Sequence, residues 1–204
     1  MNGLKRVISR GSKKNPDTHS VSPFRLSFTS DGIDWISVFA KDWNKTKVIS
    51  DSEGLLAAWE RLQASGETID KTSITCLAKT YGKTSGKWLF FVKTGDKVGS
   101  VWAKVAKAVV SGDLCYCAKI SPFDPSGSGS HVCCMYNDDF TNEDEVMALE
   151  QRIRDSGIYT TLLYKPDVYT CLGIYKQKNE WNVRPTIYES NFEVVSRQSK
   201  VITN

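Results

Sequence analysis

Residues 85–112 read SGKWLFFVKTGDKVGSVWAKVAKAVVSG, and the hydrophobic period of this stretch changes halfway along it. Residues 87–93 are rich in aromatic and β-branched side chains, which is typical of a strand. Residues 98–111 instead place valine and tryptophan on one face of a helix, and Gly112 follows as its end. The stretch therefore predicts a strand followed by a helix.

The same order, two strands and then a helix, recurs on either side of this stretch. One helix is expected over 51–64, where Ser50 and Glu53 have the spacing of a capping box. Another is expected from Thr141 up to Gly157. The expected strand pairs are 35–40 with 45–49, 73–79 with 87–93, and 114–120 with 131–136, and a closing set follows at 159–164, 170–176 and 182–188.

These elements predict the fold class. Strands that are joined as hairpins, with a helix after each pair, favour an α+β domain with a curved, largely antiparallel sheet of about eight strands. Three helices are expected to back one face of this sheet, which leaves the other face open. The single domain is expected over 31–195, between a basic, disordered N-terminal tail (1–30) and a short C-terminal tail (196–204).

The charge of the chain gathers in that N-terminal tail. The formal net charge is +4, and residues 1–25 hold six lysines and arginines against Asp17. A basic, serine-rich segment with few apolar residues is typical of disorder, and a tail that helps to hold RNA or acts as a nuclear signal is the alternative. No apolar stretch has the length of a signal peptide or a membrane span, so a cytoplasmic or nuclear protein without membrane contact is expected.

Six cysteines fall mostly in apolar, strand-like segments, which favours reduced core thiols. His131, Cys133 and Cys134 lie close to a strand that holds Cys115 and Cys117, and this invites a metal site. Adjacent cysteines on one strand point to opposite faces, however, whereas zinc ligands come in spaced pairs on turns. No metal and no cofactor is therefore expected.

Catalytic motifs are scarce. Residues 82–87 (GKTSGK) and 126–130 (SGSGS) resemble phosphate-binding loops faintly, but both are expected as hairpin turns, with an anion cradle at 126–130 as the alternative. The histidines are His19, in the tail, and His131. Asp138 and Asp139 precede a helix, where carboxylates favour the helix dipole. A non-enzymatic protein is expected, with an enzyme acting on a nucleotide or an RNA end as an alternative.

Aromatic side chains beside cations are the remaining constellation. Aromatic residues of strands and loops are accompanied by basic ones, which suits a stacked base with its phosphates, although each could also be structural. The aromatic members are Trp43, Tyr81, Tyr136, Tyr169 and Trp181, and the basic members are Lys79, Lys87, Lys119, Lys165 and Arg184. Trp59 and Trp102 lie on helix stripes, where core packing and a partner groove are the two candidates.

Several segments resemble known proteins. Residues 48–59, 85–89 and 101–112 follow in order the landmarks of eukaryotic translation initiation factor 4E. A closer resemblance, over about residues 33–192, is to the Bles family (basophilic leukaemia-expressed protein), which is similar in fold to that factor. Its matching segments are 85–89 (SGKWL), 139–141 (DFT), 164–169 (YKPDVY), 172–175 (LGIY) and 184–188 (RPTIY).

The resemblance to factor 4E implies part of a cap-binding site. Lys87 and Lys119 stand where that factor has two phosphate-binding arginines, and Trp43 falls within a residue of its first stacking tryptophan. The second stacking tryptophan has no counterpart, since 67–86 holds Tyr81 as its aromatic residue and no Trp-Glu pair. The full set that reads the methylated cap is therefore not implied. Trp59 stands where the factor packs its regulatory peptides.

Two readings of function follow, besides the enzyme. The first is a 4E-like binding protein whose concave sheet face takes RNA or a nucleotide-like ligand. Its expected contacts are Trp43, Lys87, Lys119, Tyr136 and Tyr81. The second is a scaffold that binds a partner helix on a convex helical face over Trp59 and Trp102.

Overall fold

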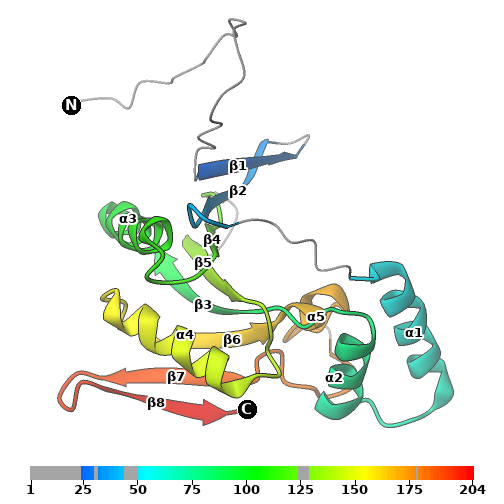
Figure 1. Ribbon diagram of the computed structural model, residues 1–204. Coiled ribbons are helices and arrows are strands. Elements are labelled where there is room, and N and C mark those ends of the chain that lie inside the picture. Colours follow the sequence, from blue (N-terminus) through cyan, green and yellow to red (C-terminus); the bar gives the residue numbers. More distant parts are fainter. Residues whose placement is uncertain (1–23, 30–31, 44–49, 124–128, 178) are drawn as a thin grey trace, which may run out of the picture.

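The computed structural model describes residues 24–29, 32–43, 50–123, 129–177 and 179–204 (Figure 1). The strands are β1 (Phe24–Thr29), β2 (Gly32–Phe39), β3 (Gly86–Lys93), β4 (Cys117–Ile120), β5 (Ser130–Asn137), β6 (Leu162–Pro166), β7 (Tyr188–Glu193) and β8 (Gln198–Thr203). The helices are α1 (Ser52–Ser65), α2 (Lys71–Thr80), α3 (Asp96–Ser111), α4 (Glu143–Asp155) and α5 (Asp167–Cys171).

All the strands of the described residues join one curved sheet. Its order is β1-β2-β4-β5-β3-β6-β7-β8, and every neighbouring pair is antiparallel. The α+β class and the antiparallel sheet of about eight strands are therefore confirmed. The order is far from sequential, because β3 lies between β5 and β6, so residues distant in sequence meet at the centre of the sheet.

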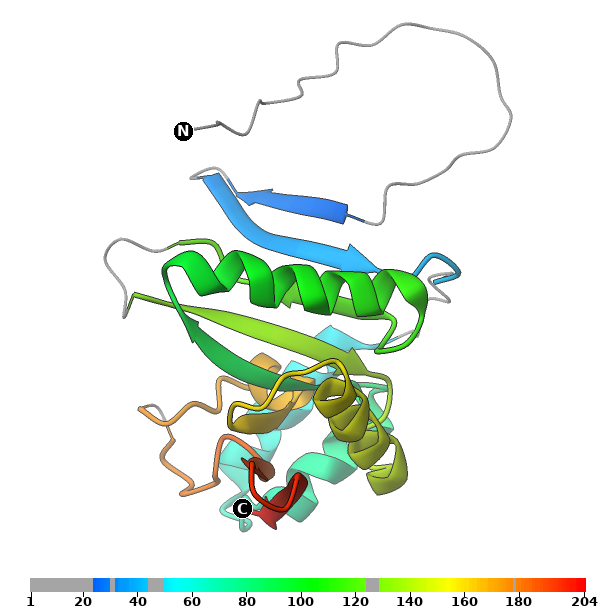
Figure 2. The same cartoon turned by 90° about the vertical axis from the view of Figure 1, so that its left-hand side faces the viewer.

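The helices divide between the two faces of the sheet. Trp88 and Lys87 are neighbours on β3 and so point to opposite faces. The indole Nε1 of Trp88 donates to the carbonyl of Val146 in α4 at 2.9 Å, whereas Lys87 pairs with Asp167 at the start of α5. In Figures 1 and 2, α3 and α4 lie on one side of the sheet and α1 and α2 on the other. The expectation that all three predicted helices share one face was wrong for α1.

The reason is a helix that the sequence pattern predicts as a strand. Residues 73–79 belong to α2, which begins after Asp70. The Asp70 side chain accepts from the Ser73 amide at 2.8 Å and the Ser73 hydroxyl accepts from the Asp70 amide at 2.9 Å, which is a capping box. Ile74 and Ala78, four residues apart, are both buried. The helices α1 and α2 thus form a separate layer, in which α1 packs on α2 and α2 packs on α5.

Other boundaries also differ from the expectation. The cap of α1 is Asp51, whose side chain accepts from the Gly54 amide at 2.8 Å, in place of the expected Ser50. Residues 170–176 contain the end of α5 and a turn instead of a strand, and β7 begins where the expected strand 182–188 ends. The segment 196–204, expected as a tail, contains β8, and β1 lies in the expected tail 1–30. The expected strand 45–49 lies outside the described residues.

One part of the core fills the space between the sheet and the pair α3 and α4, and buried residues of α1, α2 and α5 belong to the same cluster. Trp88, Phe90 and Met135 from the sheet are at most 1% exposed there. A buried ion pair lies on α4. The Arg154 guanidinium pairs there with Glu150 at 2.7 Å. It also donates to the carbonyls of Ile158, Thr160 and Ser190, so that it joins α4 to β7. No helix among the described residues has the length and apolar character to cross a bilayer.

Candidate functional site

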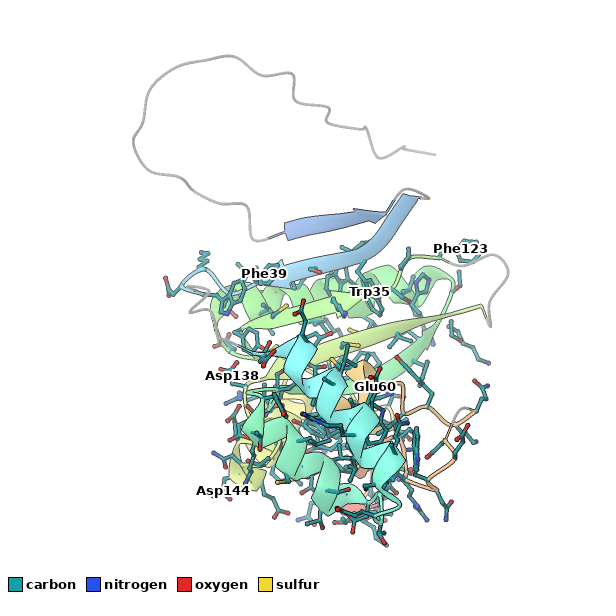
Figure 3. The ribbon with its side chains drawn as sticks, turned by 90° about the vertical axis from the view of Figure 1, so that its right-hand side faces the viewer. Trp35, Phe39, Glu60, Phe123, Asp138 and Asp144 are labelled. Atoms are coloured by element: carbon teal, nitrogen blue, oxygen red, sulfur yellow. The ribbon has the colours of Figure 1, made fainter. Side chains whose placement is uncertain are left out.

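One region of the sheet face opposite α3 and α4 carries the residues that could bind a ligand. We call it the open face, meaning the side of β2, β4 and β5 that bears Ser37, Lys119 and Tyr136. The register fixes its layout: Ser37 of β2 is opposite Lys119 of β4, Lys119 is opposite Cys134 of β5, and Tyr136 is opposite Lys87 of β3. Figure 3 looks at this side of the molecule, with α1 in front and Trp35 and Phe39 near β2.

A cluster of two cations and two aromatic rings lies on the open face. The Nζ of Lys119 lies 4.2 Å from the centroid of the Trp35 ring and 5.5 Å from that of Tyr136. The Nζ of Lys87 lies 5.6 Å from the Tyr136 centroid. Contacts of this kind are attractive because an ammonium faces the negative side of the ring. The structure thus brings together three of the five predicted contact residues, Lys87, Lys119 and Tyr136.

Trp35 is the member of this cluster that the sequence reasoning missed. It lies on β2 two residues from Ser37 and therefore on the same face. The sequence predicts a strand over 35–40, but no local pattern indicates that Lys119 lies opposite Ser37. That contact depends on the pairing of β2 with β4, which are separated by three helices and a strand in the chain.

Lys87 is not available as a phosphate ligand. It is 8% exposed and forms an ion pair with Asp167, and its Nζ also lies 3.3 Å from the Thr170 hydroxyl. The Ser85 hydroxyl donates to the same carboxylate at 2.7 Å. A buried ammonium whose charge is already balanced holds α5 against β3. The expectation of Lys87 as a free cation is therefore corrected to a structural role.

Among the described side chains, Lys119 is the cation that the open face presents. Its side chain is partly exposed, and the ion pairs among the described residues are Lys87–Asp167 and Arg154–Glu150, so none involves Lys119. Beside it, burial raises the pKa of the Tyr136 phenol far above its ordinary value, and raises the pKa of the Cys134 thiol to about 11. Both groups are therefore protonated and neutral at physiological pH. Among the side chains that the structure describes, the face thus offers one unpaired charge with aromatic surroundings.

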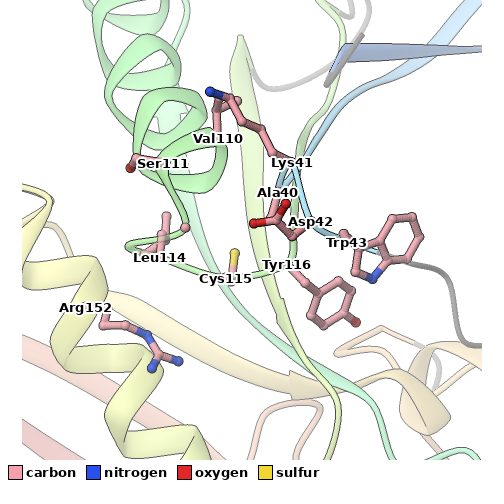
Figure 4. Close-up of a pocket in the computed structure, with 11 residues that line it drawn as sticks. Ala40, Lys41, Asp42, Trp43, Val110, Ser111, Leu114, Cys115, Tyr116 and Arg152 are labelled. Carbon is pink, nitrogen blue, oxygen red and sulfur yellow. The ribbon is translucent and has the colours of Figure 1, made fainter. Parts of the chain in front are cut away.

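Trp43 lies at the rim of the open face. Its ring stacks on Phe39, with centroids 4.6 Å apart and planes at 20°, and on Tyr116, at 5.9 Å and 13°. Trp43 and Tyr116 also line a cleft of about 650 Å³ next to the end of α3, together with Lys41 and Arg152 (Figure 4). The predicted stacking tryptophan is thus placed beside the cluster, stacked on rings of the protein itself.

Tyr81 lies at the junction of α1 and α2. It caps the C-terminus of α2, and its carbonyl accepts from the Asp51 amide at 3.1 Å. A Cβ at Gly54 would lie 2.8 Å from Cε1 of its ring. Tyr81 is therefore packed beneath the first turn of α1, and no ring or cation contact between it and the cluster is found in the part of the chain that the structure describes.

The two tryptophans proposed for a partner surface do not form one. Trp59 is 5% exposed and packs edge to face against Trp181, with centroids 4.8 Å apart. Its stripe on α1 faces the protein interior, so of the two candidates for Trp59 the structure shows core packing. Trp102 is partly buried on α3, on the opposite side of the sheet. A single convex surface over both residues was a wrong expectation.

The other sequence motifs take structural places. Residues 82–87 connect α2 to β3 and contribute Ser85 to the Asp167 network, so they are no hairpin turn. Asp139 accepts from the Thr141 amide at 2.8 Å just before α4. Most of 126–130 lies outside the described residues. Within the described residues no group of three or more histidine, cysteine, aspartate or glutamate side chains could hold a metal ion.

Comparison with known proteins gives one family and several structures. The family model described as basophilic leukemia-expressed protein Bles03 matches residues 11–173. Among solved structures, C. elegans eIF4E-3 in complex with the 4E-binding protein Mextli and cap analog is 18% identical, with a TM-score of 0.37 over 48% of this chain and 56% of that one. This chain thus spans little more than half of that relative's length.

Two structures of schistosome eIF4E with 4E-BP are also similar. The complex with m7GpppG is 13% identical, with a TM-score of 0.40 over 83% of this chain and 100% of the other. The complex with m7GpppA is 14% identical, with a TM-score of 0.36 over 72% of this chain and 89% of the other.

Proposed function

The chain belongs to the Bles03 family of basophilic leukemia-expressed proteins, and from this premise we propose that it is a non-enzymatic binding protein for a nucleotide or a segment of RNA. The ligand site is the open face, and its centre is Lys119. One observation carries the proposal: an ammonium without a carboxylate partner among the described residues lies between the Trp35 and Tyr136 rings on a strand surface.

The chemistry of these groups matches that of a nucleotide. Stacking of a base on an aromatic side chain contributes about 1–3 kcal/mol and accepts any base, because every base has a π-face. The Lys119 ammonium supplies the counter-charge for a phosphate, as a compact charge with three donors on a flexible stem. A base with its phosphate therefore fits the two kinds of group that the open face presents.

Binding rather than catalysis is favoured by the state of the polar groups nearby. A general base or a nucleophile needs a pKa near the working pH or a free lone pair. Burial keeps the Tyr136 phenol and the Cys134 thiol protonated, and Asp167 already accepts from Lys87 and Ser85. We therefore assign the face a binding role, and place the protein in the cytoplasm or nucleus, where such ligands occur.

The test is a titration with three probes: GTP, a cap analogue and a short single-stranded RNA. Quenching of tryptophan fluorescence reports binding, because Trp35 is in contact with the proposed site. Lys119→Met is expected to weaken the affinity at least about tenfold through loss of the charge. Lys93→Met is the matched control, since Lys93 is an exposed lysine on the same face of β3 as Lys87. Absence of quenching by all three probes at high micromolar concentration would contradict the proposal.

A further inference from the structure

The Trp35 ring already has a cation over it. At 4.2 Å from the ring centroid, the Lys119 ammonium is closer to Trp35 than either lysine of the cluster is to Tyr136. A cation within about 6 Å of an indole face is held by the ring quadrupole, and indole is the strongest of the aromatic partners. The face of Trp35 that a base would use for stacking is therefore the face that Lys119 covers.

Lys119 can leave this position without unfolding anything. Its backbone is fixed in β4, opposite Ser37, while its side chain is a four-carbon stem. The Tyr136 ring lies within reach as well, at 5.5 Å from the same Nζ. The lysine has no carboxylate partner among the described residues to hold it in place. A phosphate that approaches the face can thus draw the ammonium away from this side of the ring, where a base can take its place.

We propose, on the basis of the function proposed above, that Lys119 is a built-in occupant of the Trp35 ring and makes the open face selective for ligands that join a phosphate to an uncharged base. A ligand whose base is itself a cation binds the open face less tightly. It has to replace an existing contact between a cation and the same ring, and it places a second positive charge beside the displaced ammonium.

Within the part of the chain that the structure describes, no free carboxylate of the cluster relieves that repulsion. Asp167 is the acid in contact with the cluster, and it is held by Lys87 and by the Ser85 hydroxyl at 2.7 Å. Recognition of a cationic base edge would need an acceptor of this kind to be free. The same arrangement that makes Lys119 attractive to phosphates therefore acts against N7-methylated purines.

The experiment compares GTP with N7-methyl-GTP, which carry the same phosphates and differ by the positive charge on the base. Isothermal titration calorimetry on the full chain is expected to give GTP an affinity at least tenfold higher. Lys119→Met is expected to weaken GTP binding and to abolish the preference, whereas Lys119→Arg keeps both. Lys93→Met, the control on the same strand face, is expected to change neither, and circular dichroism verifies that each variant is folded.

The outcomes separate the two proposals. Equal or tighter binding of N7-methyl-GTP would overturn the selectivity and leave the binding function intact. A preference for GTP that persists in Lys119→Met would also overturn it, because the discrimination would then come from other residues. If neither nucleotide nor RNA binds, the proposed function fails and the selectivity fails with it.

Discussion

Lys165 of β6 lies directly opposite Lys87 of β3, so that two lysines share the buried surface beneath α5 with the single carboxylate of Asp167. Lys165 is 6% exposed, and its Nζ donates to the Ile174 carbonyl at 2.8 Å and lies 3.7 Å from the Tyr175 ring centroid. Burial lowers the pKa of Lys165 from 10.5 to about 8, and the charge of Lys87 lowers it further against the opposing effect of Asp167.

This pair predicts a dependence of stability on pH. Between about pH 8 and about pH 10.5 the unfolded chain retains the Lys165 proton that the folded protein has released, so the free energy of unfolding rises with pH. Lys165→Met lacks this contribution. The difference in unfolding free energy, wild type minus variant, is therefore expected to increase between about pH 7.5 and about pH 9.5 in urea titrations. Comparison with the variant is essential, because the raised pKa values of the buried thiols act in the opposite direction in both proteins. A difference that stays level or falls would refute the assignment.

The ion pair itself predicts a large loss of stability in Asp167→Asn. The substitution leaves Lys87 buried without its counter-charge, which costs about 3–5 kcal/mol for a pair removed from water. Chemical denaturation followed by circular dichroism measures the loss. Asp144→Asn, an exposed carboxylate in the first turn of α4, serves as the control and is expected to change the free energy by less than about 0.5 kcal/mol. Equal losses of unfolding free energy in the two variants would show that the Lys87–Asp167 pair does not stabilise the fold.

Trp59 predicts a second stability effect, and this one separates a core residue from a partner anchor. Because Trp59 is 5% exposed and packs on Trp181, Trp59→Ala is expected to lower the free energy of unfolding by about 3–5 kcal/mol. Trp102→Ala removes a partly exposed indole and is expected to lower it by less. Thermal melts of the two variants test the order. A Trp59→Ala protein that melts like the wild type would restore the reading of Trp59 as a surface anchor.

Two glycines in helices predict opposite effects of the same substitution. A Cβ at Gly54 would lie 2.8 Å from both the Asp51 carboxyl carbon and the Tyr81 ring, so Gly54→Ala disturbs the cap of α1 and is expected to destabilise by about 1–3 kcal/mol. A Cβ at Gly99 in α3 meets nothing within 4 Å, and Gly99→Ala is expected to stabilise by about 0.5–1 kcal/mol because alanine favours helices. Melting temperatures that move in the same direction would contradict this account.

The sequence predicts local features of this protein better than its long-range pairings. The helical stripe that ends at Gly112 and the strand around Trp88 are both as expected, because their periods are set by residues close in the chain. Residues 73–79 were expected as a strand, yet they hold two β-branched residues, Ile74 and Thr75, and Asp70 and Ser73 cap a helix there. The spacing of Asp70 and Ser73, which is that of a capping box, is the sequence signal that indicates this helix.

The sequence predicts part of the candidate site, because local strand patterns can be recognised in it whereas long-range pairings cannot. Lys87, Lys119 and Tyr136 lie on strands that the sequence predicts, and they were expected as contacts on one sheet face. The sequence does not predict that Asp167 neutralises the charge of Lys87. These residues are 80 positions apart and meet because β3 lies beside β6. Trp35 was missed because its contact with Lys119 follows from the register of β2 on β4, which no local pattern specifies.

The Arg154 guanidinium bears on the order in which the chain can assemble. Its partners come from α4 itself, from the loop that follows, and from Ser190 on β7. During synthesis α4 leaves the ribosome well before residue 190. Until β7 arrives, the nascent chain cannot bury this cation with its bonds complete, since an unpaired guanidinium is expensive to remove from water. The complete set of Arg154 hydrogen bonds therefore requires β7, the strand that supplies Ser190.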